Sequence, residues 1–245
     1  MLKHIPNIIT SLNVLCGCVA VIFAVSGDLI TASFFVFFGI FFDFFDGFAA
    51  RMFRAQSDLG LQLDSLADMI TSGLAPSIVM VQLLSKSISG EYLILTAESF
   101  SNTWESYLPF VGLLIAVASA YRLAKFNIDT RQTTSFIGLP TPANALLILS
   151  LPLILQYQNS EMVSSIVLNQ WVLIGITLVS SMLLNAEIPL FALKFKTWDV
   201  KSNTIRYIFL GVSILAIVLF RFMAIPLIIA FYIVLSLSRR ENRVS

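Results

Sequence analysis

The sequence has 245 residues, of which 58% are hydrophobic and only 12% are charged. Soluble globular domains are typically about 45–50% apolar and about 25% charged, so this composition excludes an ordinary soluble protein and indicates one that lies in a lipid bilayer. The net charge of +1, without a long basic stripe, argues against a nucleic-acid-binding protein. A span takes roughly 20 apolar residues, so the length fits roughly six to eight helices in a single membrane domain.

Apolar runs separated by helix-breaking residues predict an all-α, polytopic transmembrane helix bundle. The eight predicted segments lie near residues 8–26, 29–53, 60–85, 108–126, 141–157, 170–188, 205–221 and 224–238. The last two are short and are joined by residues 221–226, so they form either a tight hairpin or one broken span. Seven spans is therefore the alternative to eight.

The N-terminal segment has a positive tip and an apolar run, as a secretory signal does. Polar residues between Asn7 and Asn13 interrupt it and no clear small-residue cleavage site follows, so we expect a retained first helix. Cys16 and Cys18 point to different faces of such a helix, and we expect them to pack rather than to form a disulfide. His4 is the single histidine, which excludes a metal site built on several histidines.

Basic residues predict the orientation in the membrane. With eight spans and a cytoplasmic N terminus, 13 of the 15 Lys and Arg residues fall on the cytoplasmic side. These are Lys3, Arg51, Arg54, Arg122, Lys125, Arg131, Lys194, Lys196, Lys201, Arg206, Arg239, Arg240 and Arg243. Only Lys86 and Arg221 fall on the other side. We therefore expect a multi-pass protein of the cell (inner) membrane with both termini in the cytoplasm.

Four aspartates occur within the second and third predicted membrane helices. A carboxylate inside a membrane helix costs about 2.5–3.5 kcal/mol on insertion scales, so it normally faces a polar cavity. Asp43 and Asp46 are three residues apart, and Asp64 and Asp68 are four apart, so each pair projects from one helix face. The short connection makes the two helices antiparallel neighbours. All four carboxylates can then meet at one level near the cytoplasmic surface.

Four carboxylates in a low dielectric repel one another or take up protons unless cations neutralise them. Because the ligands are all oxygens, with no Cys or His nearby, the expected cations are Mg²⁺, Mn²⁺ or Ca²⁺. Two divalent ions would balance the four charges. Gly47, Ala50 and Gly60 lie beside the aspartates, where small residues permit close approach of another helix or of a ligand. We expect a ligand slot there.

The spacing of these residues is D-x2-D-G-x2-A-R-x8-G-x3-D-x3-D. It is formed by Asp43, Asp46, Gly47, Ala50, Arg51, Gly60, Asp64 and Asp68. This pattern resembles the complete signature of the CDP-alcohol phosphotransferases. The resemblance implies six core helices in the membrane, usually in a dimer, holding two metal ions. The catalytic core is then expected within about residues 1–190 and a C-terminal helical hairpin within about 205–238, in one membrane domain of residues 1–245.

Four further stretches resemble the integral-membrane phosphatidylserine synthases within that family. They are IPNIITSLNVLCG (5–17), DMITSGLAPS (68–77), AYRLAKFN (120–127) and FIGLPTPANA (136–145). Lys125 departs from the expected Arg, which keeps the charge and loses the bidentate geometry. Asn144 departs in a stretch that is usually richer in alanine. This resemblance implies that CDP-diacylglycerol and L-serine are substrates and that CMP is released.

The resemblance also implies roles for single residues. Metal ligands would be Asp43, Asp46, Asp64 and Asp68, with Mg²⁺ or Mn²⁺ as the cofactor. Asp68 would also be the general base for the serine hydroxyl. The cytidine nucleotide would be bound by Asn7, Thr10, Gly47, Ala50, Arg51 and Gly60. Arg122 and Lys125 would bind the serine carboxylate.

Two alternatives follow from the same residues. Clustered intramembrane carboxylates also occur in divalent-cation transporters, although no acidic residue continues this path at mid-membrane. A sister enzyme using glycerol 3-phosphate or an inositol phosphate would share the signature. A phosphorylated acceptor would call for more basic residues around the slot.

Overall fold

The computed structural model describes residues 4–94, 103–129, 135–191 and 199–241. The first half holds α1 (Ile5–Val25), α2 (Leu29–Met52), α3 (Asp58–Asp68), the π-helical segment η2 (Met69–Leu74), α4 (Ala75–Ser89), the 3-10 turns η4 (Trp104–Ser106) and η5 (Leu108–Leu113), and α5 (Leu114–Ile128). The second half holds β1 (Ser135–Ile137), α6 (Thr141–Tyr157), α7 (Glu161–Val167), α8 (Gln170–Asn185), β2 (Pro189–Phe191), α9 (Val200–Phe220), η6 (Arg221–Met223) and α10 (Ala224–Glu241).

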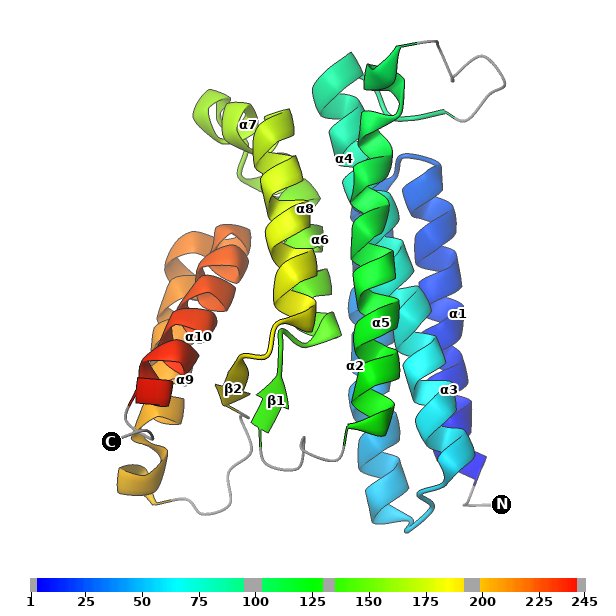
Figure 1. The fold of residues 1–245 in the computed structure, drawn as a ribbon, viewed down its shortest axis with the longest axis vertical. Coiled ribbons are helices and arrows are strands. Elements are labelled where there is room, and N and C mark those ends of the chain that lie inside the picture. Colours follow the sequence, from blue (N-terminus) through cyan, green and yellow to red (C-terminus); the bar gives the residue numbers. More distant parts are fainter. Residues whose placement is uncertain (1–3, 95–102, 130–134, 192–198, 242–245) are drawn as a thin grey trace.

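The long helices run up and down in a bundle (Figure 1), with α1 to α5 on one side, α6 and α8 in the middle and α9 with α10 on the other side. The start of α1 and the end of α10 lie toward the same end of the bundle, where α2 also meets α3 (Figure 1). Each of the eight predicted segments contains a helix. The predicted all-α polytopic class is confirmed.

Several helices in the described parts of the chain are long enough to span a membrane. Five helical runs are long and apolar enough to cross a membrane: Ile5–Val25, Leu29–Met52, Asp58–Ser89, Trp104–Ile128 and Asn203–Ser238. The pair α7 and α8, bent by 53°, gives a sixth if it is one span, and α6 is shorter, with 17 residues. An integral membrane protein is thus supported, and the count of eight spans stays a prediction.

The run Asn203–Ser238 folds back on itself. Arg221 has a left-handed backbone with φ of 48°. The Phe209 ring of α9 then stacks on the Phe231 ring of α10, with centroids 6.0 Å apart. Of the two arrangements considered for this region, the structure has the tight hairpin.

The connection between α2 and α3 brings the two aspartate pairs together. Arg54 reverses the chain with a left-handed φ of 52°, and the Ser57 hydroxyl accepts a hydrogen bond from the Gly60 N–H at 3.1 Å as the N-cap of α3. At the other end of α2, the Asp28 carboxylate accepts from the Thr31 N–H at 3.0 Å, and this bond lowers the pKa of Asp28. Both ends of α2 are therefore fixed.

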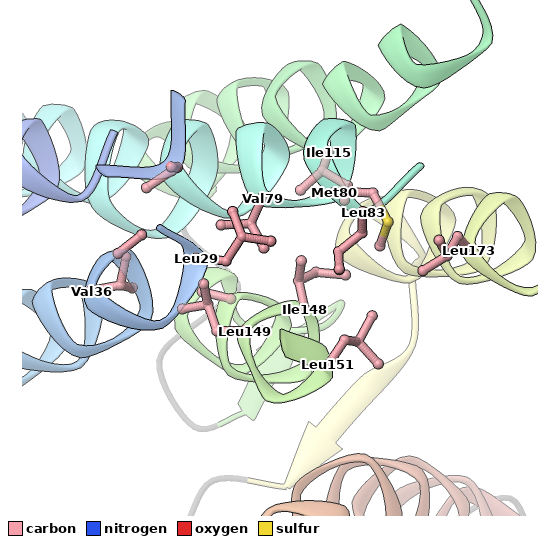
Figure 2. Close-up of a cluster of buried hydrophobic side chains, with 14 of the residues drawn as sticks. Leu29, Val36, Val79, Met80, Leu83, Ile115, Ile148, Leu149, Leu151 and Leu173 are labelled. Atoms are coloured by element: carbon pink, nitrogen blue, oxygen red, sulfur yellow. The ribbon is translucent and has the colours of Figure 1, made fainter. Parts of the chain in front are cut away.

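The main core packs α2, α4, α5, α6 and α8 together (Figure 2). Its fully buried side chains include Leu29, Val36, Val79, Met80, Leu83, Ile115, Ile148, Leu149 and Leu173. In a bilayer such contacts stabilise the bundle by van der Waals packing, because lipid is as apolar as these side chains. The face of α2 opposite the core exposes Phe34, Phe38, Phe41 and Phe44, as expected for side chains that meet lipid.

The sequence did not predict four of the elements: α7, β1, β2 and η2. The helix α7 has only seven residues and begins where the Ser160 hydroxyl accepts from the Val163 N–H at 3.3 Å. The strands β1 and β2 form an antiparallel pair in which Phe136 lies opposite Leu190. The π-helical turn η2 interrupts the third predicted segment directly after Asp68.

Some of the basic residues used for orientation fall outside the described residues. They are Lys3, Arg131, Lys194, Lys196 and Arg243. Of the cysteines, Cys16 is partly buried, Cys18 is exposed and both are free.

Candidate metal and nucleotide site

Three carboxylates meet where α2 and α3 face each other. One oxygen each from Asp43, Asp46 and Asp64 lie within 4.8 Å of one another. The Asp46 side chain is buried, and the other two are half-buried. Asp68 lies one helical turn deeper, is 9% exposed and is not part of this triplet. The structure thus brings three of the four predicted ligands together, with the fourth next to them.

These residues fit a divalent cation. Oxygen ligands lie about 2.0–2.6 Å from Mg²⁺ or Ca²⁺, so two ligands of one ion are at most about 5 Å apart, which the triplet satisfies. Oδ2 of Asp46 and Oδ1 of Asp68 are buried and have no hydrogen-bond partner among the described residues. A buried carboxylate oxygen without a partner is costly, and a divalent cation would satisfy both oxygens.

A cleft of about 430 Å³ opens beside the triplet, between α1, α2 and α3. Its walls contain all six residues that the resemblance assigns to the nucleotide: Asn7, Thr10, Gly47, Ala50, Arg51 and Gly60. Asp46 and Asp64 line it as well. This volume lies within the usual range of small-molecule sites, about 300–1,000 Å³.

The small residues of the motif keep the cleft open. A Cβ added to Gly47 would meet only the Arg51 Nη1 atom, at 3.8 Å, so the space beside Gly47 belongs to the cleft rather than to a helix contact. On α1, the Thr10 hydroxyl donates to the Pro6 carbonyl at 3.0 Å, which leaves its oxygen able to accept from a ligand.

Sequence analysis missed six residues of the cleft wall. They are Pro6, Ala55, Gln56, Ser57, Asp58 and Leu61. Five of them lie between Ala55 and Leu61, in the eight-residue gap of the motif and just beyond Gly60. The motif fixes the length of that gap, which indicates that the gap forms part of the site. It does not specify which residue types stand there.

The two predicted serine contacts have different surroundings. Arg122 is 8% exposed, and its Nη1 donates to the Thr141 hydroxyl at 2.9 Å. Its guanidinium interacts electrostatically with Asp68. Lys125 instead forms an ion pair with Glu187 at 3.2 Å, with side chains that are 30% and 67% exposed. The structure therefore brings Arg122 to Asp68, whereas Lys125 faces Glu187.

The π-helical segment η2 holds Asp68 at the centre of the bundle. The Thr71 hydroxyl donates to the Asn13 carbonyl of α1 at 3.1 Å. A Cβ on Gly39 of α2 would clash with the Thr71 side chain of η2 and would lie 2.8 Å from the Asn13 Oδ1 atom of α1. The absence of a side chain at Gly39 therefore lets α1, α2 and η2 pack closely. Short π-helical turns inside α-helices frequently occur at functional sites.

Comparisons with known proteins agree with the motif. The family model for CDP-alcohol phosphatidyltransferase matches residues 3–183. Three relatives carry the name CDP-diacylglycerol--serine O-phosphatidyltransferase. The Bacillus subtilis protein is 38% identical over 145 residues, 58% of this chain and 71% of the relative. The Helicobacter pylori protein is 28% identical over 214 residues, covering 84% and 79%. The Methanocaldococcus jannaschii protein is 32% identical over 177 residues, covering 72% and 71%.

The chain belongs to the CDP-alcohol phosphatidyltransferase family. The family predicted from the aspartate spacing is confirmed, and the matched residues extend from α1 to α8. An enzyme is therefore favoured over the cation transporter considered from the sequence. The hairpin of α9 and α10 lies beyond the matched region.

Proposed function

We propose that the protein transfers the phosphatidyl group of CDP-diacylglycerol to the hydroxyl of L-serine, giving phosphatidylserine and CMP. One observation carries the proposal: the acidic triplet lies beside a cleft, and that cleft is lined by every residue that the resemblance assigns to the nucleotide. The names of the three relatives support serine as the acceptor.

The cleft between α1, α2 and α3 holds the cytidine nucleotide. Gly47, Ala50 and Gly60 leave room for it, and Asn7 and Thr10 offer polar groups. The diphosphate lies toward Asp46 and Asp64, at the acidic end of the cleft. Arg51 is exposed at the cleft wall and contacts a phosphate group.

Asp43, Asp46, Asp64 and Asp68 hold two divalent cations, Mg²⁺ or Mn²⁺. When bound, these ions neutralise charge on the phosphate oxygens as the bond to CMP breaks. The protein's part is to fix four oxygen ligands on two helices whose connection is capped and short. A rigid arrangement of this kind needs little reorganisation during the reaction.

Asp68 accepts the proton of the serine hydroxyl. The hydroxyl oxygen then forms a bond with the lipid-bearing phosphorus, and the bond between that phosphorus and the bridging oxygen of CMP breaks. CMP leaves with the electron pair of that bond. Arg122 pairs with the serine carboxylate, and Lys125 is the second predicted contact. Removing a positioned general base typically costs 10²- to 10⁴-fold in rate.

The active site faces the cytoplasm of a cell with both termini on that side, in its inner membrane. The distribution of basic residues supports this orientation, and release of a soluble product such as CMP agrees with it. We further propose one membrane domain, with the catalytic core within about residues 1–190 and the hairpin within about 205–238. A homodimer, which the family resemblance implies, belongs to the same proposal.

The direct test is CMP release by the purified full-length protein in detergent. With CDP-diacylglycerol, L-serine and Mn²⁺ or Mg²⁺, we expect CMP and phosphatidylserine in equal amounts. Excess EDTA should abolish release, and fresh divalent ion should restore it. Faster turnover with glycerol 3-phosphate or an inositol phosphate than with serine would overturn the acceptor assignment. Turnover that survives EDTA would overturn the role of the aspartates.

A further inference from the structure

Four polar side chains lie buried on η2, α5 and α6, and one of them, Arg122, interacts electrostatically with Asp68. Each has a buried polar atom without a hydrogen-bond partner among the described residues. They are Ser72 of η2, Ser119 and Arg122 of α5, and Asn144 of α6. Together with Thr141, which binds Arg122, we call them the inner polar cluster.

The helices place these residues at one level. The bond from Arg122 to Thr141 links α5 to α6, and the two helices run in opposite directions (Figure 1). Ser119 precedes Arg122 by three residues and Asn144 follows Thr141 by three, so both lie about 4.5 Å deeper in the bundle. A Cβ on Gly73 would lie 3.0 Å from the Ser119 Cβ, which shows how closely α5 packs against η2 beside Ser72.

Asn144 is the member whose burial needs most explanation. Its side chain is 0% exposed, and neither its amide nitrogen nor its amide oxygen has a partner among the described residues. Leaving a buried amide unpaired costs about 1–3 kcal/mol for each group. Ser150 on the same helix is equally buried, but its hydroxyl donates to the Leu147 carbonyl at 2.6 Å. Asn144 has no such local solution, so its amide requires a partner that the helices do not supply.

A free amino acid has the complementary groups. Its carboxylate needs donors, which the Arg122 Nε and the Asn144 amide nitrogen provide. Its ammonium group needs acceptors, which the Asn144 amide oxygen and the hydroxyls of Ser72 and Ser119 provide. A phosphorylated alcohol has no ammonium group, so it would leave the Asn144 amide oxygen unpaired. It also carries about two negative charges, which the single buried guanidinium of Arg122 would not balance.

We propose that Asn144, together with Arg122, recognises the amino-acid end of the acceptor and selects a zwitterionic amino alcohol over a phosphorylated one. This inference rests on the proposed function and adds a specificity residue to it. Asn144 touches the part of the acceptor that does not react. Its loss should therefore change acceptor affinity and selectivity more than the handling of CDP-diacylglycerol.

The test compares Asn144→Ala with the wild-type protein and with Ser150→Ala, a matched loss of a buried polar group on α6. In Asn144→Ala we expect the KM for L-serine to rise about 10- to 100-fold, the effect of losing a hydrogen bond to a charged group. The KM for CDP-diacylglycerol should stay within twofold. Stabilisation of the protein against heat by added L-serine, measured without turnover, should be lost in Asn144→Ala and retained in Ser150→Ala.

Two acceptor analogues report on the two ends of the zwitterion. Ethanolamine lacks the carboxylate and 3-hydroxypropionate lacks the ammonium group, so wild-type protein should use both poorly. The preference for serine over each analogue should shrink in Asn144→Ala. If the preference and the serine KM stay within twofold of wild type, the inference is overturned and internal water is the partner of Asn144.

Failure of the proposed function gives a different result, because the wild-type protein would then release no CMP in response to serine. If Asn144→Ala is unstable in detergent, Ser119→Ala is the second variant. We expect the KM for L-serine to rise about tenfold or more in that variant, because Ser119 would lose its hydrogen bond to the charged ammonium group. A KM within twofold of wild type in Ser119→Ala would also overturn the inference.

Discussion

Between α1, α2 and α3 the site is an open cleft of about 430 Å³, lined by glycines, alanines and polar side chains. Between η2, α5 and α6 the polar side chains are buried, and several lack partners among the described residues. Asp68 stands between these two sides. In the proposed function the open cleft binds the nucleotide and the buried side binds the acceptor.

Exchanging Asp68 for asparagine should have the largest effect, because Asp68 is the proposed general base. In Asp68→Asn we expect kcat to fall about 10²- to 10⁴-fold, since the amide cannot accept the hydroxyl proton. CMP-dependent heat stabilisation should persist if the Asp43, Asp46 and Asp64 triplet suffices to hold the nucleotide and its metal. The measurement is CMP release at saturating serine, together with a thermal shift on adding CMP and Mn²⁺.

The matched control for this exchange is Asp28→Asn at the far end of α2. Asparagine caps a helix about as well as aspartate, so stability and turnover should both stay near wild type. A kcat within tenfold of wild type in Asp68→Asn would remove Asp68 as the base. Loss of the thermal shift as well as turnover would make Asp68 chiefly a metal ligand.

Filling the open side should have the next largest effect. In Gly47→Leu the new side chain enters the cleft, because the space beside Gly47 holds only the Arg51 Nη1 atom within 4 Å. We expect the KM for CDP-diacylglycerol to rise about tenfold or more, in line with about 1–3 kcal/mol for overpacking. The KM for serine should change little. Steady-state kinetics, with each substrate varied in turn, measures the two KM values separately.

Gly175→Leu on α8 is the control for the same change in side-chain size, since a Cβ there meets nothing within 4 Å. It should leave both KM values unchanged. An equal rise in the two KM values of Gly47→Leu would mean that the nucleotide and the acceptor do not bind on separate sides of the site.

The open side was largely predictable from sequence, and the buried side was not. Asp43, Asp46, Gly47 and Gly60 stand at fixed spacings on two helices with a short connection, so helix geometry alone brings them together. The register of α5 against α6 depends instead on the bond between Arg122 and Thr141, whose residues are 19 apart. No local pattern predicts that contact.

The same distinction holds for the fold. Hydrophobic runs predicted the long helices to within a few residues. They did not predict η2, because a π-helical turn adds one residue per turn without changing the apolar composition of Met69–Leu74. The pairing of β1 with β2 joins segments about 50 residues apart, and each strand has only three residues. Such contacts are decided by tertiary packing rather than by the local sequence.

The smallest effect is expected for the outermost cation of the acceptor side. Lys125 and Glu187 form an exposed ion pair, and such pairs contribute only about 0–1 kcal/mol. In Lys125→Ala we therefore expect the serine KM to rise no more than about threefold, and in Glu187→Gln a similarly small change. Arg122→Lys keeps its charge but loses the planar guanidinium, and its serine KM should rise about tenfold or more. If Lys125→Ala raised the serine KM more than Arg122→Lys did, the acceptor carboxylate would bind beside the exposed Lys125 rather than at the buried Arg122.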